Sequence, residues 1–249
     1  MKLSIITINK NNASGLLKTL ESIRDQLTEQ MELLVIDGVS VDNSLDIIYT
    51  YQKYITAYIS EPDKGIYDAM NKGVKMAQGE YVYFLNAGDT WNKELNLYDI
   101  LLNSEDSDFI FGSCNLIYSD ILSYTDYLPI RMKKYDFYDG VCHQSMIIKR
   151  KLFLRGGYRT DLLVSDWYFM IESILVHSKT FTTLPFVFCI YDFRGVSSSS
   201  EGQERIKTEK QELWKAHRLG WNHWKYITYC LSPRILKKKL FVRLIRILS

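Results

Sequence analysis

Proline and cysteine are scarce in this sequence, and each shortage excludes a class of protein. With four prolines, 47% hydrophobic residues and 24% charged residues, the composition is that of an ordinary folded chain rather than a disordered one. The four cysteines form no Cys-x-x-Cys pair, so the sequence has neither a disulfide framework nor the usual spacing of a zinc site. This usage suits a reducing compartment.

Long apolar runs are missing as well. No run approaches the ~20 apolar residues of a membrane-spanning helix, and the opening "LSIITI" is too short for the core of a signal peptide. We therefore expect a cytoplasmic protein. At 249 residues the chain can form one large α/β domain, or one domain with an appendage.

Acidic residues are absent from the last part of the chain. The chain up to Glu212 has 22 basic against 29 acidic residues (−7), and the tail has 9 against none (+9), which together give the formal net charge of +2. Because the body is acidic and the basic tail lacks interleaved stacking rings, the sequence argues against nucleic-acid binding.

Apolar runs alternate with helical patterns in the first half. The runs predict buried strands over 3–8, 31–37, 57–60 and 81–85, and the periodic apolar positions predict helices over 14–30 and 63–78. Such alternation implies a mostly parallel sheet covered by helices on both faces. Ligands bind beyond the carboxyl ends of these strands, where we expect one crevice lined by Thr7, Asn9, Asp37, Asp63 and Asn86 to Asp89.

The second half is less regular. We expect strands over 108–118, 122–128, 143–150 and 180–193, a mostly buried helix over 166–177, and helical structure from residue 201 onward. This organisation suggests a domain over 1–200, with a first half over 1–90 and a second over 91–200, and a C-terminal extension over 201–249.

Asp89 ends the segment "GEYVYFLNAGDT", in which an apolar run stops abruptly. One interpretation is a turn, because Asn-Ala-Gly-Asp is good turn chemistry. The other is a metal ligand, because Mg²⁺ or Mn²⁺ needs only one or two carboxylates when substrate phosphates supply the remaining oxygens.

The loops after the second and third strands carry further candidates. Asp37 is a turn residue or a nucleoside ligand, and Asp42 can cap the following helix. Lys64, among the backbone N–H groups at a helix start, favours an anion. Asp68 and Lys72 form either an ordinary surface pair or part of the site, and Asn71 lies beside them.

Asp166 opens a very apolar helix, "SDWYFMIE". Partial burial would raise its pKa toward the range useful for a general base; alternatively, Ser165 or Asp166 caps the helix. His143 and Gln144 open a predicted strand. Tyr67, Trp91 and Trp167 line a sugar pocket or pack in the core.

Taken in order along the chain, these segments resemble inverting glycosyltransferase family two, whose members have the GT-A fold. "SIITINKNN" is similar to the family's nucleotide loop, "LLVIDGVSVDNS" to its second strand with the base-binding acid, and "EPDKGIYDAMNKGVKMAQGEYVYFLNAGD" to the stretch leading into its Asp-x-Asp motif. "SDWYFMIE" occupies the place of the segment with the catalytic base. Where many relatives have Asp-x-Asp, this chain has Asn86-Ala87-Gly88 and keeps a carboxylate only at Asp89.

The resemblance implies a mechanism and a role for each candidate. The donor would be a UDP-sugar, and Asp166 would deprotonate the acceptor hydroxyl for a single displacement with inversion. Asp89 would hold Mn²⁺ or Mg²⁺ at the diphosphate. Uridine would contact Thr7, Asn9, Asp37 and Asp63. The rest of the nucleotide-sugar site would be Lys64, Asp68, Asn71, Asn86, Ala87 and Gly88. Nearer the diphosphate or the acceptor we expect His143, Gln144 and Trp167.

The tail has the pattern of a basic amphipathic helix. In "SPRILKKKLFVRLIRILS" the apolar residues fall on one face, which suits the anionic inner face of the cytoplasmic membrane, or packing against the domain. A lipid-diphosphate-linked glycan acceptor would follow, in the biosynthesis of a surface polysaccharide such as O-antigen. The alternatives are a sugar-phosphate nucleotidyltransferase and a non-catalytic nucleotide-sugar-binding protein at the membrane surface.

Overall fold

The computed structural model describes residues 2–104, 106–119, 122–132, 134–139, 141–192 and 200–216. Its described part contains one mixed sheet of nine strands. The strands are β1 (Leu3–Asn9), β2 (Met31–Asp37), β3 (Ala57–Ser60), β4 (Tyr81–Phe84), β5 (Thr90–Trp91), β6 (Phe109–Ser119), β7 (Leu122–Asp126), β8 (Met146–Lys149) and β9 (Phe181–Asp192). Their order is β3-β2-β1-β4-β8-β6-β9-β5, and β7 pairs with β6.

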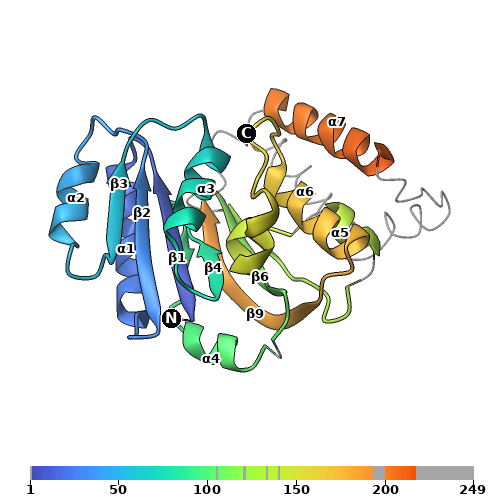
Figure 1. Cartoon of the computed structure of the whole chain (residues 1–249), viewed down its shortest axis with the longest axis horizontal. Helices are drawn as coiled ribbons and strands as arrows, with labels where there is room; N and C mark the ends of the chain where they lie inside the picture. The colour runs from blue at the N-terminus through green and yellow to red at the C-terminus, as the bar shows by residue number, and fades with distance from the viewer. Residues whose placement is uncertain are drawn as a thin grey trace.

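Helices cover both faces of this sheet (Figure 1). The α-helices are α1 (Ala13–Ile23), α2 (Ser44–Thr50), α3 (Ile66–Met76), α4 (Leu97–Leu102), α5 (Lys134–Asp139), α6 (Ser165–Ile171) and α7 (Ser200–Ala216). Shorter segments are the 3₁₀ turns η1 (Arg24–Gln26), η2 (His143–Ser145) and η3 (Arg150–Arg155) and the π-helical η4 (Glu172–Val176).

The first half of the sheet is parallel, as the sequence predicts. β1 lies between β2 and β4, and β3 extends the sheet beyond β2, all in parallel register. Because side chains alternate between the faces, Ile6 and Leu34 join the core beneath α3 whereas Ile5 and Leu33 join the core beneath α1. Burial on both faces explains why these strands read as continuous apolar runs.

Helix α3 approaches the sheet closely at Gly73. A Cβ atom at this position would lie 2.4 Å from Ile6 Cγ2, so the helix can pack at this distance only with glycine there. This packing brings the first turn of α3 to the carboxyl ends of β1 and β2.

The second half of the sheet is mixed. β8 pairs antiparallel with both β4 and β6, while β6 and β9 are parallel. Helices α5, α6 and α7 share the core beneath α3, with Trp167 of α6 and Trp214 of α7 both buried in it. The described part of the predicted extension is therefore packed on the body of the protein.

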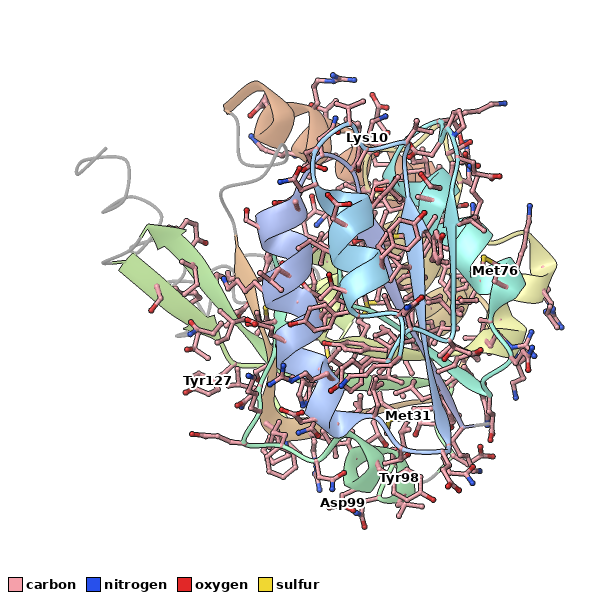
Figure 2. The ribbon with its side chains drawn as sticks, turned by 90° about the vertical axis from the view of Figure 1, so that its left-hand side faces the viewer. Lys10, Met31, Met76, Tyr98, Asp99 and Tyr127 are labelled. Atoms are coloured by element: carbon pink, nitrogen blue, oxygen red, sulfur yellow. The ribbon has the colours of Figure 1, made fainter. Side chains whose placement is uncertain are left out.

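The carboxyl ends of the parallel strands lie along one edge of the molecule. Figure 2 shows Lys10, just after β1, at one end and Met31, at the start of β2, at the opposite end, with Tyr98 and Asp99 of α4 near Met31. The candidate site residues belong to the Lys10 end.

Several predicted boundaries are wrong in detail. The helix predicted over 14–30 ends as an α-helix at Ile23 and continues only as η1. His143 and Gln144 form a 3₁₀ turn rather than opening a strand, because the ladder with β6 starts at Met146. The predicted basic amphipathic helix lies outside the described residues. No helix within the described ranges is long and apolar enough to cross a membrane.

Candidate active site

Asp37 is the centre of a buried hydrogen-bond network at the end of β2. Its Oδ1 accepts from Asn9 Nδ2 at 2.9 Å and from Ser40 Oγ at 2.5 Å. Its Oδ2 accepts from the Ser40 backbone N–H at 2.9 Å and from Ser60 Oγ at 2.7 Å. Burial would raise the pKa of Asp37, but these hydrogen bonds outweigh it and hold that pKa below its usual value. Asp37 is thus an ionised anchor for the loops after β1, β2 and β3.

The loop after β2 is strained at Val39. Its φ of 57° lies in the left-handed region, which costs most for a β-branched residue. The loop is held there because Ser40 Oγ accepts from the Asn11 backbone N–H at 2.8 Å, and Asn11 Oδ1 accepts from the Val41 backbone N–H at 2.8 Å. The ends of β1 and β2 therefore form one unit.

The loop from Asn86 to Asp89 is held by hydrogen bonds from α1 and from its N-cap residue, Asn12. Thr19 Oγ1 donates to the Asp89 carbonyl at 2.7 Å and accepts from the Gly88 N–H at 3.0 Å. Asn12 Nδ2 donates to the Ala87 carbonyl at 3.0 Å. Gly88 has a φ of 108°, which glycine adopts without strain. The turn predicted from the sequence is present, and the carboxylate of Asp89 is buried beside it.

Three buried oxygen atoms at this edge have no hydrogen-bond partner among the described residues: Thr7 Oγ1, Asn9 Oδ1 and Asn86 Oδ1. Thr7 and Asn9 end β1, and Asn86 follows the neighbouring β4. Buried polar atoms are nearly always hydrogen-bonded. Three of them at the ends of two adjacent strands leave unused hydrogen-bonding capacity at this edge of the sheet.

Asp166 lies in the first turn of α6 and accepts two hydrogen bonds. Tyr67 Oη donates to its Oδ1 at 2.7 Å, and His143 Nδ1 lies 3.2 Å from its Oδ2. The predicted rise in pKa is wrong: burial acts to raise it, but His143 and Tyr67 together lower the pKa of Asp166 to about 2. Because of this low pKa, the carboxylate is ionised at neutral pH. Its side chain is 17% exposed, so it is also reachable.

The start of α6 is capped from another helix. Glu209 Oε2, on α7, accepts from the backbone N–H groups of Leu163 and Val164 at 2.8 and 3.0 Å. Val164 occupies the N-cap position and makes no side-chain cap, so neither Ser165 nor Asp166 serves as the cap suggested by the sequence. The carboxylate of Asp166 is left available for its other contacts.

The turn η2 connects the two halves of the site. His143 Nε2 lies 3.0 Å from Asn86 Nδ2, and Gln144 Nε2 donates to Asp89 Oδ2 at 3.0 Å. Gln144 is held in turn by Cys142, whose Sγ donates to Gln144 Oε1 at 2.8 Å. Two adjacent side chains thus join Asp166 on α6 to the loop after β4.

The polar residues around the start of α3 have different contacts: Asp63 lies against a neighbouring loop, whereas Asp68 contacts its own helix. Asp63 Oδ1 accepts from the Gly65 N–H at 2.9 Å, and Asp63 Oδ2 lies 2.3 Å from where a Cβ of Gly38 would be, against the loop after β2. Asp68 instead accepts from the Lys64 N–H at 3.0 Å and closes the start of its own helix. The side chain of Lys64 is exposed.

Asn71 and Trp167 have structural contacts. The Asn71 side chain donates to the Tyr158 carbonyl at 2.7 Å and accepts from the Tyr158 N–H at 2.8 Å, so it ties α3 to the loop before α6. Trp167 is buried, and its indole N–H donates to the Phe137 carbonyl at 2.8 Å. Trp91 is likewise a core residue.

Sequence reasoning missed Thr19, Ser40, Ser60 and Glu209, and left Tyr67 between a pocket and the core. Each of these side chains has at least one partner distant in sequence; Tyr67 and Asp166, for example, are 99 positions apart. Short polar side chains on helices and loops have no local signal that distinguishes such partners from ordinary surface residues.

The donor set at Asp89 fits a hard divalent cation that is completed by a ligand. Within the described ranges, no group of three or more His, Cys, Asp and Glu side chains is arranged to hold a metal ion. Mg²⁺ and Mn²⁺ are commonly held by one or two carboxylates together with substrate phosphates. A single buried carboxylate beside partnerless oxygens therefore suits a cation bound with a diphosphate.

A family model described as glycosyl transferase family 2 matches residues 4–175. The chain belongs to this family. It is 29% identical over 216 residues, 82% of each chain, to a PGL/p-HBAD biosynthesis glycosyltransferase of Mycobacterium bovis (strain BCG / Pasteur 1173P2). It is also 34% identical over 94 residues, 36% of this chain and 37% of the relative, to the Bacillus subtilis (strain 168) teichuronic acid biosynthesis glycosyltransferase TuaG.

Solved structures of glycosyltransferases share the fold. Staphylococcus aureus TarS residues 1–349, in complex with UDP-GlcNAc, superposes with a TM-score of 0.67 over 84% of this chain at 19% identity. The mannosyltransferase PcManGT of Pyrobaculum calidifontis, in complex with GDP-Man and Mn²⁺, has a TM-score of 0.65 over 88% of this chain at 20% identity. The chain spans 65% of either structure's length. The predicted GT-A fold is confirmed.

Proposed function

We propose that this family 2 glycosyltransferase transfers a sugar, with inversion, from a UDP-sugar to a hydroxyl group of a glycan acceptor. The observation that carries the proposal is the turn η2, which places an ionised carboxylate, Asp166, on one side and the loop with Asp89 on the other. A displacement at an anomeric carbon needs this pair: a base for the nucleophile and a site for the departing diphosphate.

On the donor side, uridine would lie against the unit formed by the loops after β1 and β2. Thr7 and Asn9 offer partnerless oxygens there, and Asp63 lies beside Gly38. Asp37 already accepts four hydrogen bonds, about the capacity of a carboxylate, so its part would be to hold Ser40 and Ser60 in place around the nucleoside. The TarS structure with UDP-GlcNAc supports UDP as the nucleotide.

At the reaction centre, the acceptor oxygen forms a bond to the anomeric carbon while the bond from that carbon to the diphosphate oxygen breaks. The hydroxyl proton passes to Asp166, and the bonding electrons leave with UDP. Asp89 would hold Mn²⁺ or Mg²⁺, which supplies neutralising charge at the diphosphate. The backbone of Ala87 and Gly88, fixed by Asn12 and Thr19, keeps the loop from moving as charge develops.

Asn86 and His143 would line the diphosphate side of the centre. The exposed Lys64 would approach the anionic donor from the start of α3, whereas Asp68, Asn71 and Trp167 would contribute by holding the walls of the site. This division differs from the roles that the resemblance alone suggests, because the polar groups of Asn71 and Trp167 are already paired within the protein.

The test is calorimetric titration with UDP, with and without Mn²⁺, in the wild-type chain and in Asp89→Ala. We expect UDP binding that Mn²⁺ strengthens and that Asp89→Ala weakens. Asp99→Ala, an exposed acid on α4 at the opposite end of the sheet, is the matched control and should bind as the wild type does. GDP serves as the competing nucleotide, and preference for it would exclude UDP as the donor.

Asp166→Asn distinguishes the catalyst from the alternatives. In a glycosyltransferase this variant loses turnover and keeps UDP affinity, whereas a non-catalytic binding protein shows no turnover to lose. A nucleotidyltransferase would release pyrophosphate from UTP and a sugar phosphate, which is measured separately. No heat with UDP in either condition would contradict the donor site.

We propose further that the acceptor is a lipid-diphosphate-linked glycan of a surface polysaccharide such as O-antigen, met at the inner face of the cytoplasmic membrane. The name of TuaG, which refers to teichuronic acid biosynthesis, supports a role in polysaccharide assembly, and the basic pattern after Glu212 supports attraction to anionic lipid. The full chain should sediment with vesicles containing phosphatidylglycerol and not with neutral ones. Replacing Lys237, Lys238 and Lys239 by Gln should weaken this binding.

A further inference from the structure

His143 contacts both halves of the proposed active site. Its Nδ1 lies 3.2 Å from Asp166 Oδ2, and its Nε2 lies 3.0 Å from Asn86 Nδ2. The contacts are not those of a core histidine, because the side chains of His143 and Asp166 are 16% and 17% exposed and lie at the margin of the site.

The partners of the ring decide which nitrogen carries the hydrogen. A carboxylate oxygen accepts only, so Nδ1 facing Asp166 is the N–H. In the neutral ring protonated at Nδ1, Nε2 has the lone pair and can accept from the amide N–H of Asn86. In this arrangement Asn86 Oδ1 is left buried without a partner among the described residues.

The Asn86 side chain is not needed to hold its own loop. Backbone contacts from Thr19 and Asn12 fix the loop from Asn86 to Asp89, and the Ala87 N–H donates to the Ile8 carbonyl at 3.0 Å. One end of the Asn86 amide therefore contacts His143, and the oxygen at its other end is buried without a partner among the described residues. A ligand that fixes this amide also fixes the imidazole behind it.

We propose that His143 is a positioning residue that couples occupancy of the diphosphate loop, through Asn86, to the orientation of Asp166. The inference rests on the proposed function and adds a form of regulation to the same site: the base is held in its working orientation when the donor is in place. Such coupling would limit proton abstraction by Asp166 until a donor occupies the site.

Two conservative variants separate the two contacts of the ring. The side-chain N–H of His143→Asn can replace Nδ1–H toward Asp166 but cannot reach Asn86. The side-chain oxygen of His143→Gln can accept from Asn86, but this variant loses the Nδ1–H position. If coupling needs both contacts, each variant should lower kcat on the order of 100-fold, as for a displaced catalytic group, with little change in the KM for the donor. His177→Gln, on an exposed histidine after α6, is the control and should leave kcat unchanged.

A spectroscopic readout is independent of turnover. Nitrogen-15 NMR of the imidazoles in the full chain at neutral pH should show His143 as the Nδ1–H tautomer. UDP with Mg²⁺ should then shift the ring signals of His143 and leave those of His177 in place. Binding of UDP to the same sample is checked by calorimetry.

The outcomes distinguish this inference from the function beneath it. An Nε2–H tautomer, full turnover in His143→Asn, or unmoved His143 signals in protein that binds UDP would each overturn the coupling and leave the glycosyltransferase assignment intact. Absence of UDP binding would overturn the proposed donor site and the coupling together. The tautomer, the UDP-dependent shift and equal losses in the two variants would establish it.

Discussion

Tyr67 and Asp166 form a 2.7 Å hydrogen bond that joins the first turns of α3 and α6, across 99 positions of sequence. Burial and the neighbouring carboxylate raise the pKa of the Tyr67 hydroxyl far above its usual range, so it donates at every working pH. The contact ties the donor-side helix to the residue that we propose as the base.

Tyr67→Phe removes this donor and leaves the ring. Because hydrogen bonds to charged groups contribute about 1.5–3 kcal/mol, we expect the free energy of unfolding in urea to fall by about 2 kcal/mol at neutral pH. The pKa of Asp166 should rise toward its usual value, which would move the acidic limb of the kcat profile to higher pH. Tyr98→Phe, on α4 at the other end of the sheet, is the control (Figure 2). An unchanged acidic limb would contradict the role of this hydrogen bond.

Stability should depend on Asp166 in acid. Its pKa is lowered from 3.8 to about 2 in the folded protein, so its ionised form stabilises the fold fully above the higher value, and that stabilisation is lost as the pH falls through the lower one. The lowering corresponds to about 2 kcal/mol. The difference in unfolding free energy between wild type and Asp166→Asn should therefore shrink by about this amount between pH ~5 and pH ~2. A constant difference across that range would show that the carboxylate is not stabilised in the fold.

Glu209 should affect catalysis from α7. Glu209→Ala leaves two backbone N–H groups before Asp166 without their acceptor, at a cost of about 1–3 kcal/mol, and should lower kcat more than UDP affinity. Glu209→Gln keeps an oxygen at the same place, since Oε2 alone accepts both bonds, and should recover most of the loss. The exposed Glu204 of the same helix provides the matched control, Glu204→Ala. Equal effects of the Ala and Gln variants would point to loss of charge instead of loss of the cap.

Val39→Gly should relieve the strain in the loop after β2. A left-handed β-branched residue costs about 1–3 kcal/mol, which exceeds the entropic cost of about 1 kcal/mol for introducing glycine. We expect a small gain in unfolding free energy, on the order of 1 kcal/mol, with weaker UDP binding if the loop becomes mobile. Val41→Gly, two residues on and without a positive φ, should give no such gain. Destabilisation by Val39→Gly would mean that the Val39 side chain contributes packing in this loop.

The elements of the first half could be predicted because their causes are local. Strands such as Leu3–Asn9 and Met31–Asp37 are buried on both faces and read as unbroken apolar runs, and the polar residues that follow them must lie at the carboxyl edge of a parallel sheet. The start of β8 was misplaced because His143 and Gln144 precede the apolar run directly, and only the register with β6 shows that pairing begins at Met146.

By itself, then, the sequence determined the α/β alternation, the edge of the sheet at which the site lies, and the family resemblance that suggests roles for its acidic residues. Only the tertiary structure decided what those acids do. The apolar residues around Asp166 in the sequence correctly predicted that it is partly buried. The sign of its pKa shift, however, depends on Tyr67 and His143, which come from other elements. Hydrogen bonds between residues far apart in sequence depend on how strands and helices pack, and no local pattern records that packing.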